Sequence, residues 1–240
     1  MAFNKLIIIP AFNESNNIHH TLTEIRRCAD GFDLLVVDDG SSDDTRERAV
    51  EAGAEVISLP FNLGIGGAVQ AGLMHAHRAG YEYAIRLDAD GQHDPEDIHA
   101  ILKSLQVDDA DMVIGSRFIG KNREGYAPRW PRRLGIFYLS AIIFGLTGQR
   151  VLDTTSGFCG WNRKGIDLFA QMFPVDFPEP ESLVIASRFG LSISEVPVVM
   201  RQRYSGKSSI NFIRTFYYLF KVSLALFLMT LSRQEGDRHE

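Results

Sequence analysis

The chain has 240 residues, of which 45% are hydrophobic and 23% are charged, and its formal net charge is −5. These proportions exclude a wholly disordered, collagen-like or coiled-coil chain, and the length predicts one large domain or one domain with an appendage. Two cysteines exclude a disulfide framework and fit a reducing compartment. The negative net charge argues against nucleic acid as a partner.

Charge is divided unevenly along the chain. Residues 1–111 hold 8 basic and 20 acidic side chains, whereas residues 112–240 hold 17 and 10. A metal-handling region beside a region that faces an anionic acceptor or a membrane would show this division. An unevenly charged, solvated surface is the alternative.

Short apolar, β-branched runs alternate with helical patterns through the first half of the chain. The helical patterns start near Ser15, Ser41, Gly64 and Asp94. Strand, helix, strand repetition predicts an α/β fold with a mainly parallel central sheet flanked by helices. The expected strands are Lys5 to Pro10, Leu34 to Asp38, Glu55 to Leu59, Tyr83 to Leu87, Met112 to Gly115 and Ser192 to Met200.

The C-terminal region predicts membrane association. Residues 212–231 are strongly apolar but carry Arg214 and Lys221, so they are borderline for a spanning helix. A broad apolar face with a thin cationic stripe favours a helix that lies in the membrane interface; a core helix or a partner-binding helix is the alternative. The stretch 134–146, which follows a basic segment, is expected to dock beside it. The N-terminal apolar run is too short for a signal peptide, which predicts a cytoplasmic catalytic part.

Three acidic or amide side chains follow the fourth expected strand at a spacing of two. If the chain stays extended there, Asp88, Asp90 and Gln92 point to one side. Oxygen ligands without nearby Cys or His suit Mg²⁺ or Mn²⁺. An ordinary acidic loop is the alternative.

Two further carboxylates, Asp38 and Asp39, end the second expected strand. A buried carboxylate there needs hydrogen bonds, which a nucleobase imide or ribose hydroxyls would supply. Helix capping by Asp39 or Ser41 is the alternative. Glu14 could likewise sit in the first turn of the next helix, and the glycine-rich segment 62–67 reads as structural rather than as a dinucleotide site.

Taken together, the motifs resemble those of family-two inverting glycosyltransferases with the GT-A fold. They are Pro10-Ala11-Phe12-Asn13-Glu14, Val37 to Thr45, Asp88-Ala89-Asp90-Gly91-Gln92-His93, Gly115-Ser116-Arg117, Asp153 to Phe158 and Arg203 to Ser209. Within that family the chain is most similar to the dolichol-phosphate mannosyltransferase group and its bacterial polyprenyl-phosphate relatives. The resemblance covers roughly residues 4–210. It implies a glycosyltransferase domain over residues 1–210. Many relatives continue into clear transmembrane helices, and here the chain departs from them. Its own residue pattern predicts a membrane-associated helix over 211–232 among C-terminal interfacial helices, and a polar tail over 233–240.

The resemblance also implies residue roles. The residues implied to bind the nucleotide are Pro10, Ala11, Asn13, Glu14, Asp38, Asp39, Asp88 and Ala89. The metal site falls to Asp88, Asp90 and Gln92, and the acceptor site to Arg117, Arg129, Arg132, Arg133, Ser156 and Gly157. The catalytic set is Asp90, Arg117, Arg203 and Lys207, with the last two in a loop that closes over the diphosphate.

The residues and the resemblance lead to one expected activity. We expect a metal-dependent inverting transfer of a sugar from a UDP- or GDP-sugar to a polyprenyl phosphate at the cytoplasmic membrane face, with a membrane protein as a further candidate partner. A sugar hydroxyl as acceptor is the alternative, and Glu179 or Glu181 would then act as general base. Nucleotidyl transfer and a decayed membrane-docked scaffold are less favoured rivals, because the basic region precedes apolar helices and the metal residues are intact.

Overall fold

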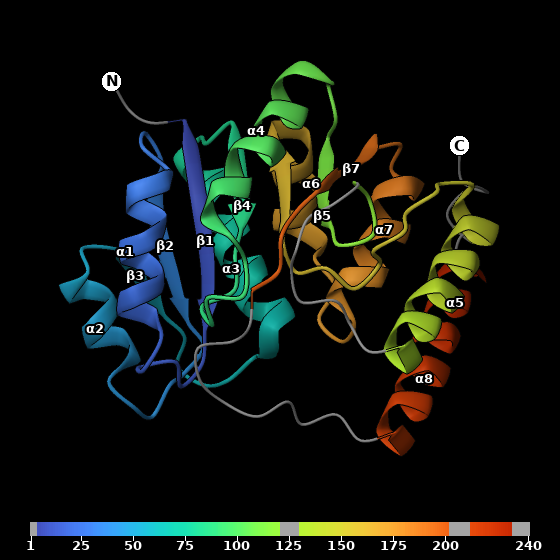
Figure 1. Cartoon of the computed structure of the whole chain (residues 1–240), viewed down its shortest axis with the longest axis horizontal. Coiled ribbons are helices and arrows are strands. Elements are labelled where there is room, and N and C mark those ends of the chain that lie inside the picture. Colours follow the sequence, from blue (N-terminus) through green and yellow to red (C-terminus); the bar gives the residue numbers. More distant parts are fainter. Residues whose placement is uncertain (1–3, 121–129, 202–211, 232–240) are drawn as a thin grey trace.

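A computed structural model describes residues 4–120, 130–201 and 212–231, and only the backbone at residues 131, 212–217 and 231. Within these ranges the chain forms one sheet of seven strands in the order β3-β2-β1-β4-β6-β5-β7 (Figure 1). The strands are β1 (Lys5–Ala11), β2 (Asp33–Asp38), β3 (Glu55–Ser58), β4 (Tyr83–Arg86), β5 (Met112–Ser116), β6 (Cys159–Asn162) and β7 (Ile193–Pro197). The expected mixed α/β fold is therefore confirmed.

Most strands pair in parallel, as the alternating pattern predicts. β1 pairs in parallel with both β2 and β4, β2 with β3, and β5 with β7. The exception is β6, which runs antiparallel between β4 and β5. This strand was not predicted from the sequence, because its four residues include Gly160 and Asn162 and no β-branched side chain.

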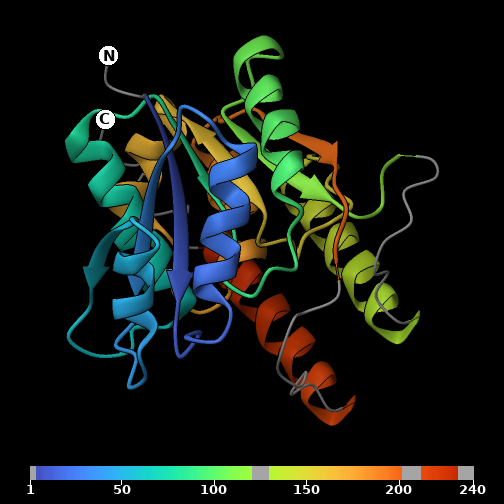
Figure 2. The same ribbon diagram turned by 60° about the vertical axis from the view of Figure 1, so that its left-hand side comes forward.

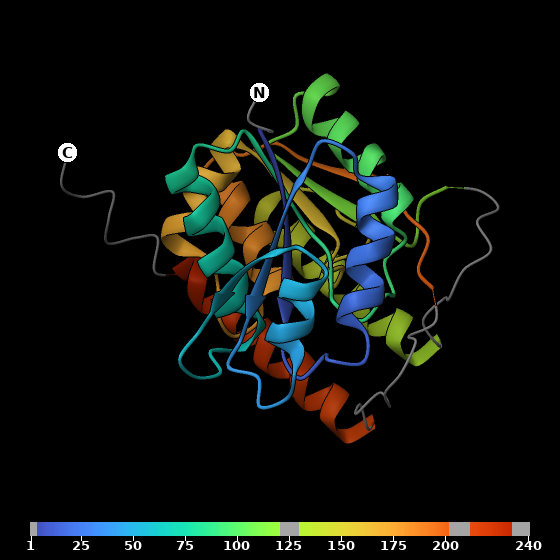
Figure 3. The same ribbon diagram turned by 90° about the vertical axis from the view of Figure 1, so that its left-hand side faces the viewer.

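Helices cover both faces of the sheet. They are α1 (Ile18–Cys28), α2 (Thr45–Glu51), α3 (Gly64–Ala79), α4 (Ile98–Val107), α5 (Trp130–Thr147), α6 (Arg163–Met172), α7 (Pro178–Arg188) and α8 (Phe212–Leu231), with a 3₁₀ turn over Pro95–Asp97. Alternate side chains of β1 divide the core. Leu6 and Ile8 pack with the cluster that holds α3 and α5 to α8, whereas Ile7 and Ile9 pack with the cluster that holds α1, α2 and α4. Helices are seen on both faces of the sheet when the molecule is turned (Figure 2, Figure 3).

Helix starts depart from the expected positions by a few residues. The helices expected near Ser15 and Ser41 begin at Ile18 and Thr45, and α3 begins at Gly64 as expected. Ser41 is not a helix cap, because Asp44 occupies the N-cap position of α2. Asp94 does act as a cap: its side chain accepts a hydrogen bond from the Glu96 N–H at the 3₁₀ turn.

α5 and α8 pack side by side at the edge of the molecule farthest from α2 (Figure 1). This confirms the expected docking of the two apolar stretches. A β-carbon on Gly135 would stand 3.3 Å from the Leu219 side chain, so the two helices approach closely there. Val222 and Leu226 of α8 are fully buried in the core cluster that also contains residues of α5 and α7. None of the described helices has the length and apolarity needed to cross a bilayer.

Candidate active site

A pocket of about 310 Å³ opens at the carboxyl ends of β1, β2 and β4. In a parallel sheet this edge is where ligands bind. Four segments form its wall. The lining residues are Pro10, Ala11, Phe12 and Glu14 after β1, Asp39 after β2, Asn62, Gly64, Ile65 and Ala68 around the start of α3, and Arg86, Asp88, Ala89 and Asp90 after β4.

Asp39 joins the second strand end to the start of α3. Its Oδ1 accepts a hydrogen bond from the Leu63 N–H at 2.7 Å, and its Oδ2 accepts one from the Gly64 N–H at 2.9 Å. The residue is 3% exposed and lines the pocket. Asp39 therefore caps a helix, but it caps α3 rather than the helix that directly follows it. The pocket-facing position also leaves it available to a ligand's hydroxyl groups.

The loops after β1 and β2 are tied together by short polar contacts. The Asn13 N–H donates to Ser41 Oγ at 2.9 Å, and Asn13 Oδ1 accepts from the Ser42 N–H at 2.9 Å. Asp38 Oδ1 accepts from the Ser41 N–H at 3.1 Å. Asn13 and Asp38 thus hold the loops and lie outside the pocket wall, whereas Glu14 lines it. Glu14 precedes the helix rather than lying in its first turn.

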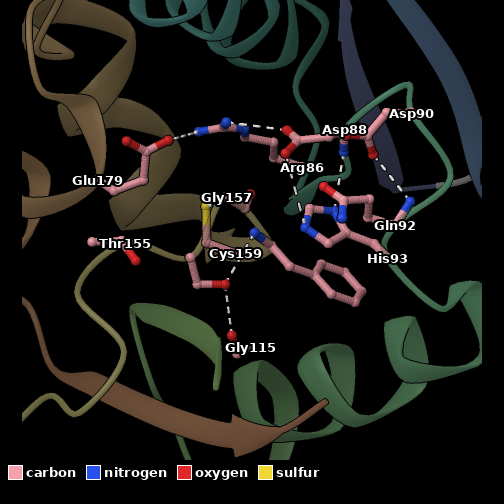
Figure 4. A network of polar contacts seen from close by, with 12 residues as sticks. Arg86, Asp88, Asp90, Gln92, His93, Gly115, Thr155, Gly157, Cys159 and Glu179 are labelled. Carbon is pink, nitrogen blue, oxygen red and sulfur yellow. Dashed lines mark hydrogen bonds and ion pairs between the residues drawn. The ribbon is translucent and has the colours of Figure 1, made fainter. Parts of the chain in front are cut away.

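The segment after β4 turns sharply, so the expectation of an extended chain with three aligned side chains is wrong. Gly91 has φ +73°, and Asp90 Oδ1 accepts a hydrogen bond from the Gln92 N–H at 3.0 Å (Figure 4). The turn keeps Asp88 and Asp90 on the pocket wall. The Gln92 side-chain amide instead lies 3.5 Å from the Arg201 carbonyl oxygen, so a metal-ligand role for Gln92 stays a prediction.

Arg86 is the site residue that the sequence interpretation missed. Nη2 of its guanidinium donates to Asp88 Oδ1 at 3.1 Å, and Nη1 donates to Glu179 Oε1 at 3.1 Å (Figure 4). Burial by itself lowers the pKa of Arg86, but the charges of Asp88 and Glu179 outweigh it and hold that pKa above its usual value. The available signal was a charged residue inside a buried strand, two positions before Asp88 and so on the same side of the strand.

His93 supports Asp88 from the other side. Its Nδ1 accepts a hydrogen bond from the Asp88 N–H at 3.1 Å, and its Nε2 lies 3.9 Å from Asp88 Oδ2. The ring stacks on Phe158 with the centroids 4.9 Å apart. Burial lowers the pKa of His93 despite the nearby carboxylates, which favours the neutral imidazole.

The donor set fits a hard divalent cation. Asp88 and Asp90 bring carboxylate oxygens to one pocket, and no group of three His, Cys, Asp or Glu side chains able to hold a metal occurs in the described part of the chain. Mg²⁺ and Mn²⁺ do not need a full protein cage, because they commonly take one or two carboxylates together with substrate phosphates and water. Asp88 and Asp90 would hold the ion in this way.

Of the residues expected to meet the acceptor, Arg117, Ser156 and Gly157 lie outside the wall of the main pocket. Arg117 forms a buried two-pronged ion pair with Asp153, with contacts of 2.6 and 2.7 Å, and donates to Thr155 Oγ1 at 2.9 Å. Ser156 Oγ donates to the Gly115 carbonyl oxygen at 2.6 Å. Gly157 lies against the Arg86 and Asp88 side chains. Gly157 therefore belongs to the network around Asp88. Arg117 and Ser156 instead make structural contacts, with Asp153 and Thr155 and with the Gly115 carbonyl oxygen.

The basic residues of the second half are only partly described. Arg132 and Arg133 are exposed in the first turn of α5, and the Arg133 guanidinium lies 5.9 Å from the centre of the Phe118 ring. Arg129, Arg203 and Lys207 lie outside the described residues, as does the tail 233–240.

Neither candidate general base lines the main pocket. Glu179 pairs with Arg86. Glu181 is buried, and its Oε2 accepts a hydrogen bond from the Phe177 N–H at 3.4 Å in the first turn of α7. Burial raises the pKa of Glu181. The two carboxylates are thus held by an ion pair and by a helix cap.

Arg86 also lines a second, smaller cavity of about 10 Å³. Arg86 Nε and Thr154 Oγ1 are buried without a hydrogen-bond partner among the described residues, and both residues line this cavity. A cavity of that volume is at the lower limit for one water molecule.

The glycine-rich segment is part of the pocket rather than only a structural element. Asn62, Gly64 and Ile65 line the wall because the start of α3 faces the ends of β1 and β2. The missed signal was the position of the segment directly after the third strand, where the chain returns to the ligand-binding edge.

The fold and the acid-lined pocket at the strand ends are those of a GT-A glycosyltransferase. Residues 6–168 match the family described as Glycosyl transferase family 2, so the chain belongs to this family and is a glycosyltransferase. The resemblance found in the motifs is therefore confirmed.

Similar curated proteins have names that contain a dolichyl phosphate, an undecaprenyl phosphate or a polyprenol monophosphomannose. The UDP-N-acetylglucosamine–dolichyl-phosphate N-acetylglucosaminyltransferase of Methanococcus voltae is 31% identical over 80% of this chain and 83% of its own length. The undecaprenyl-phosphate mannosyltransferase of Micrococcus luteus is 30% identical over 86% and 87%. The polyprenol monophosphomannose synthase of Mycolicibacterium smegmatis is 29% identical over 91% and 85%.

Solved structures support the fold. Glucosyl-3-phosphoglycerate synthase from Mycobacterium tuberculosis, crystallised with Mn²⁺, UDP-glucose and phosphoglyceric acid, superposes with a TM-score of 0.69 over 94% of this chain and 79% of that one. The identity is 21%, so the likeness concerns the fold.

Proposed function

We propose that the protein transfers a sugar, with inversion, from a UDP- or GDP-sugar to a polyprenyl phosphate, using Mg²⁺ or Mn²⁺. The observation that carries the proposal is the meeting of Asp39, Asp88 and Asp90 in one pocket at the strand ends. Asp39 offers carboxylate oxygens for ribose hydroxyls, and Asp88 with Asp90 offers them for the ion. The named acceptors of the relatives supply the acceptor class.

The reaction needs stabilisation of a leaving diphosphate more than it needs a base. When bound, the divalent ion neutralises charge on the donor diphosphate. A phosphate oxygen of the acceptor attacks the anomeric carbon as the bond from that carbon to the nucleoside diphosphate breaks, which inverts the configuration. The acceptor oxygen is already anionic near neutral pH, so no side chain has to remove a proton. Arg203 and Lys207 are assigned to the leaving diphosphate, where preorganised charge contributes most.

The acceptor phosphate requires cations that bring two anions together. We assign this to Arg129 and to Arg132 and Arg133 of the first turn of α5, because arginine pairs readily with phosphate oxygens. Arg117 is assigned an indirect role in acceptor binding, because its guanidinium is held by Asp153 and Thr155. In this assignment the basic N-terminal end of α5 marks the path by which the lipid phosphate approaches.

We place the α5 and α8 helices in the interface of the cytoplasmic membrane face. Trp130 and Leu134 of α5, and Phe220, Phe227 and Leu228 of α8, are large apolar side chains that are exposed. The adjacent Lys221 is exposed as well and can reach headgroups. A membrane-protein partner covering the same face is the alternative that vesicle binding tests.

The experiment that tests the proposal measures sugar transfer into lipid. The protein is incubated with Mn²⁺ or Mg²⁺, radiolabelled nucleotide-sugars and a short-chain polyprenyl phosphate, and label is counted in the organic phase. Metal-dependent extraction with one donor is the expected result. If a nucleotide-sugar binds with metal but no label enters the lipid, the polyprenyl phosphate acceptor is wrong and a sugar hydroxyl becomes the candidate acceptor.

A further inference from the structure

Arg86 is a buried cation that bridges two elements far apart in the sequence. It ends β4, and its guanidinium contacts Asp88 on one side and Glu179 of α7 on the other, each at 3.1 Å (Figure 4). The Arg86 side chain is 3% exposed, whereas that of Asp88 is 35% exposed. The planar guanidinium makes both contacts at once, which fixes its orientation. The bridge therefore runs from the protein interior to a carboxylate at the pocket surface.

Two side chains, those of Arg86 and His93, lie close to the Asp88 carboxylate, and His93 also accepts from the Asp88 N–H. Arg86 Nη2 contacts its Oδ1, His93 Nε2 lies 3.9 Å from its Oδ2, and the Asp88 N–H is held by His93 Nδ1. Gly157 lies close to the carboxylate as well, since a β-carbon there would stand only 3.0 Å from Asp88 Oδ2. These contacts leave the carboxylate little freedom to change rotamer, although it lines an open pocket.

Glu179 anchors the other end of the bridge. It lies in the first turn of α7, where Pro178 precedes it, and its side chain is 21% exposed. Without Glu179, the buried guanidinium of Arg86 would keep Asp88 as its one described carboxylate partner. A buried charge that loses a partner tends to move towards water or another acceptor. Glu179 therefore determines where the Arg86 guanidinium sits, and through it where the Asp88 carboxylate sits.

We propose that Arg86, anchored by Glu179, is the positioning residue that holds the Asp88 carboxylate ready for the divalent cation and donor diphosphate. This inference rests on the proposed function, because it assumes that Asp88 faces the donor. Groups that orient a metal-binding carboxylate commonly change metal affinity or activity by about 10- to 100-fold when they are replaced. In this assignment Glu179 acts as the hydrogen-bond acceptor that anchors Arg86 and not as a general base.

Arg86→Lys separates positioning from charge. Lysine keeps the positive charge but has no planar fork with which to reach both carboxylates. We expect calorimetric titration of UDP or GDP with saturating Mn²⁺ to give a dissociation constant about tenfold weaker than in the wild type. The matched control is Arg163→Lys, which alters an arginine paired with Asp167 near the opposite end of β4 and should leave that constant unchanged. An unchanged constant in Arg86→Lys overturns the inference.

Substitutions at Glu179 test the anchor and cover the case in which Arg86→Lys does not fold. Glu179→Gln retains an oxygen that accepts from Arg86 Nη1, and we expect donor binding and sugar transfer within about threefold of the wild type. Glu179→Ala removes the acceptor, and we expect the same weakening as in Arg86→Lys. Wild-type binding in Glu179→Ala contradicts positioning. Lost transfer with normal binding in Glu179→Gln also contradicts it, because that result makes Glu179 a base.

These measurements separate this inference from the proposed function. Binding of the nucleotide with Mn²⁺ does not involve a lipid acceptor. If the wild type binds a nucleotide but transfers nothing to polyprenyl phosphate, the acceptor assignment is wrong and the positioning role is still decided by the variants. If the wild type binds neither UDP nor GDP with Mn²⁺, the donor site and this inference are both wrong.

Discussion

Gly157 and Arg86 approach each other so closely that a β-carbon on Gly157 would stand 2.9 Å from Arg86 Nη2. The same β-carbon would stand 3.0 Å from Asp88 Oδ2. The absence of a side chain at this position is therefore what allows the ion pair to lie against the chain after Ser156. A single methyl group placed there has to displace one member of the pair.

Gly157→Ala is expected to weaken donor binding about tenfold, because moving Asp88 disturbs a carboxylate next to the metal. Overpacking of this kind commonly costs about 1–3 kcal/mol of stability. Calorimetry of Mn²⁺ with UDP or GDP measures the first effect, and thermal unfolding measures the second. Gly145→Ala in α5 is the control, since a β-carbon there meets nothing within 4 Å. If Gly157→Ala and Gly145→Ala bind the donor equally well, the added methyl group at residue 157 does not displace Asp88.

Asp90→Ala is expected to abolish transfer while the protein stays folded. The substitution removes one of the two carboxylates assigned to the metal, and it also removes the acceptor for the Gln92 N–H, a contact with a net contribution of about 1 kcal/mol. Lipid extraction measures the activity, and the far-UV circular dichroism spectrum checks the fold. Asp30→Ala, an exposed aspartate after α1, should remain fully active. Near-normal turnover by Asp90→Ala removes Asp90 from the metal site.

The sequence predicts which residues stand at the strand ends better than it predicts the turns and partners of those residues. Asp39, Asp88 and Asp90 were expected at one edge because each follows a continuous apolar strand, and the structure brings them to one pocket. The turn after Asp88 could not be read from a spacing of two, because that spacing fits both a strand and a turn. The partner of Asp39 is the start of α3, some 24 residues further on, which local patterns do not reveal.

Arg86 and β6 illustrate the same limit in the core. A strand motif does not say which distant carboxylate neutralises a buried arginine, and Glu179 lies 93 residues away. Arg86 pairs with Cys159 in the ladder between β4 and β6. β6 has four residues, including a glycine and an asparagine, so the sequence does not predict it as a strand. Tertiary pairing decided both features.

Asp111 gives the fold a pH dependence. Burial by itself raises the pKa of Asp111, but hydrogen bonds from Ser192 and Asn162 and the charge of Lys164 outweigh it, so the pKa lies below its usual value. The folded-state pKa is thus lower than that of the unfolded chain. The ionised carboxylate therefore stabilises the fold above about pH 4, and this contribution is lost as the pH falls through the folded-state pKa.

Asp111→Asn is accordingly expected to lower the unfolding temperature at pH 7 and to lower it less at pH 3. The cost at neutral pH should be about 1–3 kcal/mol, because the new amide group faces the Ser192 and Asn162 donors. Thermal unfolding at pH 7, 5 and 3 measures the difference from the wild type, with Asp30→Asn as an exposed control. A difference that stays constant from pH 7 to pH 3 would rule out the ionised form of Asp111 as its source.

The exposed apolar face of α8 supplies the test of membrane association. Phe220 is 63% exposed and Phe227 is 53% exposed, whereas Val222 and Leu226 of the same helix are fully buried. Deleting residues 211–240 would therefore uncover the core beneath α8 and confuse unfolding with release from the membrane. Substitutions restricted to the exposed face avoid this problem.

The double variant Phe220→Ser, Phe227→Ser is expected to sediment with anionic phospholipid vesicles at least tenfold less than the wild type. Burying one phenylalanine side chain contributes about 1.5–3 kcal/mol. Losing two of them therefore lowers the affinity for the membrane interface by at least about tenfold. Binding of the nucleotide with Mn²⁺ should stay unchanged, because neither side chain lines the pocket. Val107→Ser, at an exposed apolar position on α4, controls for a general loss of surface hydrophobicity. Sedimentation that is the same for the double variant and the wild type would remove α8 from the membrane contact and leave this face to a protein partner.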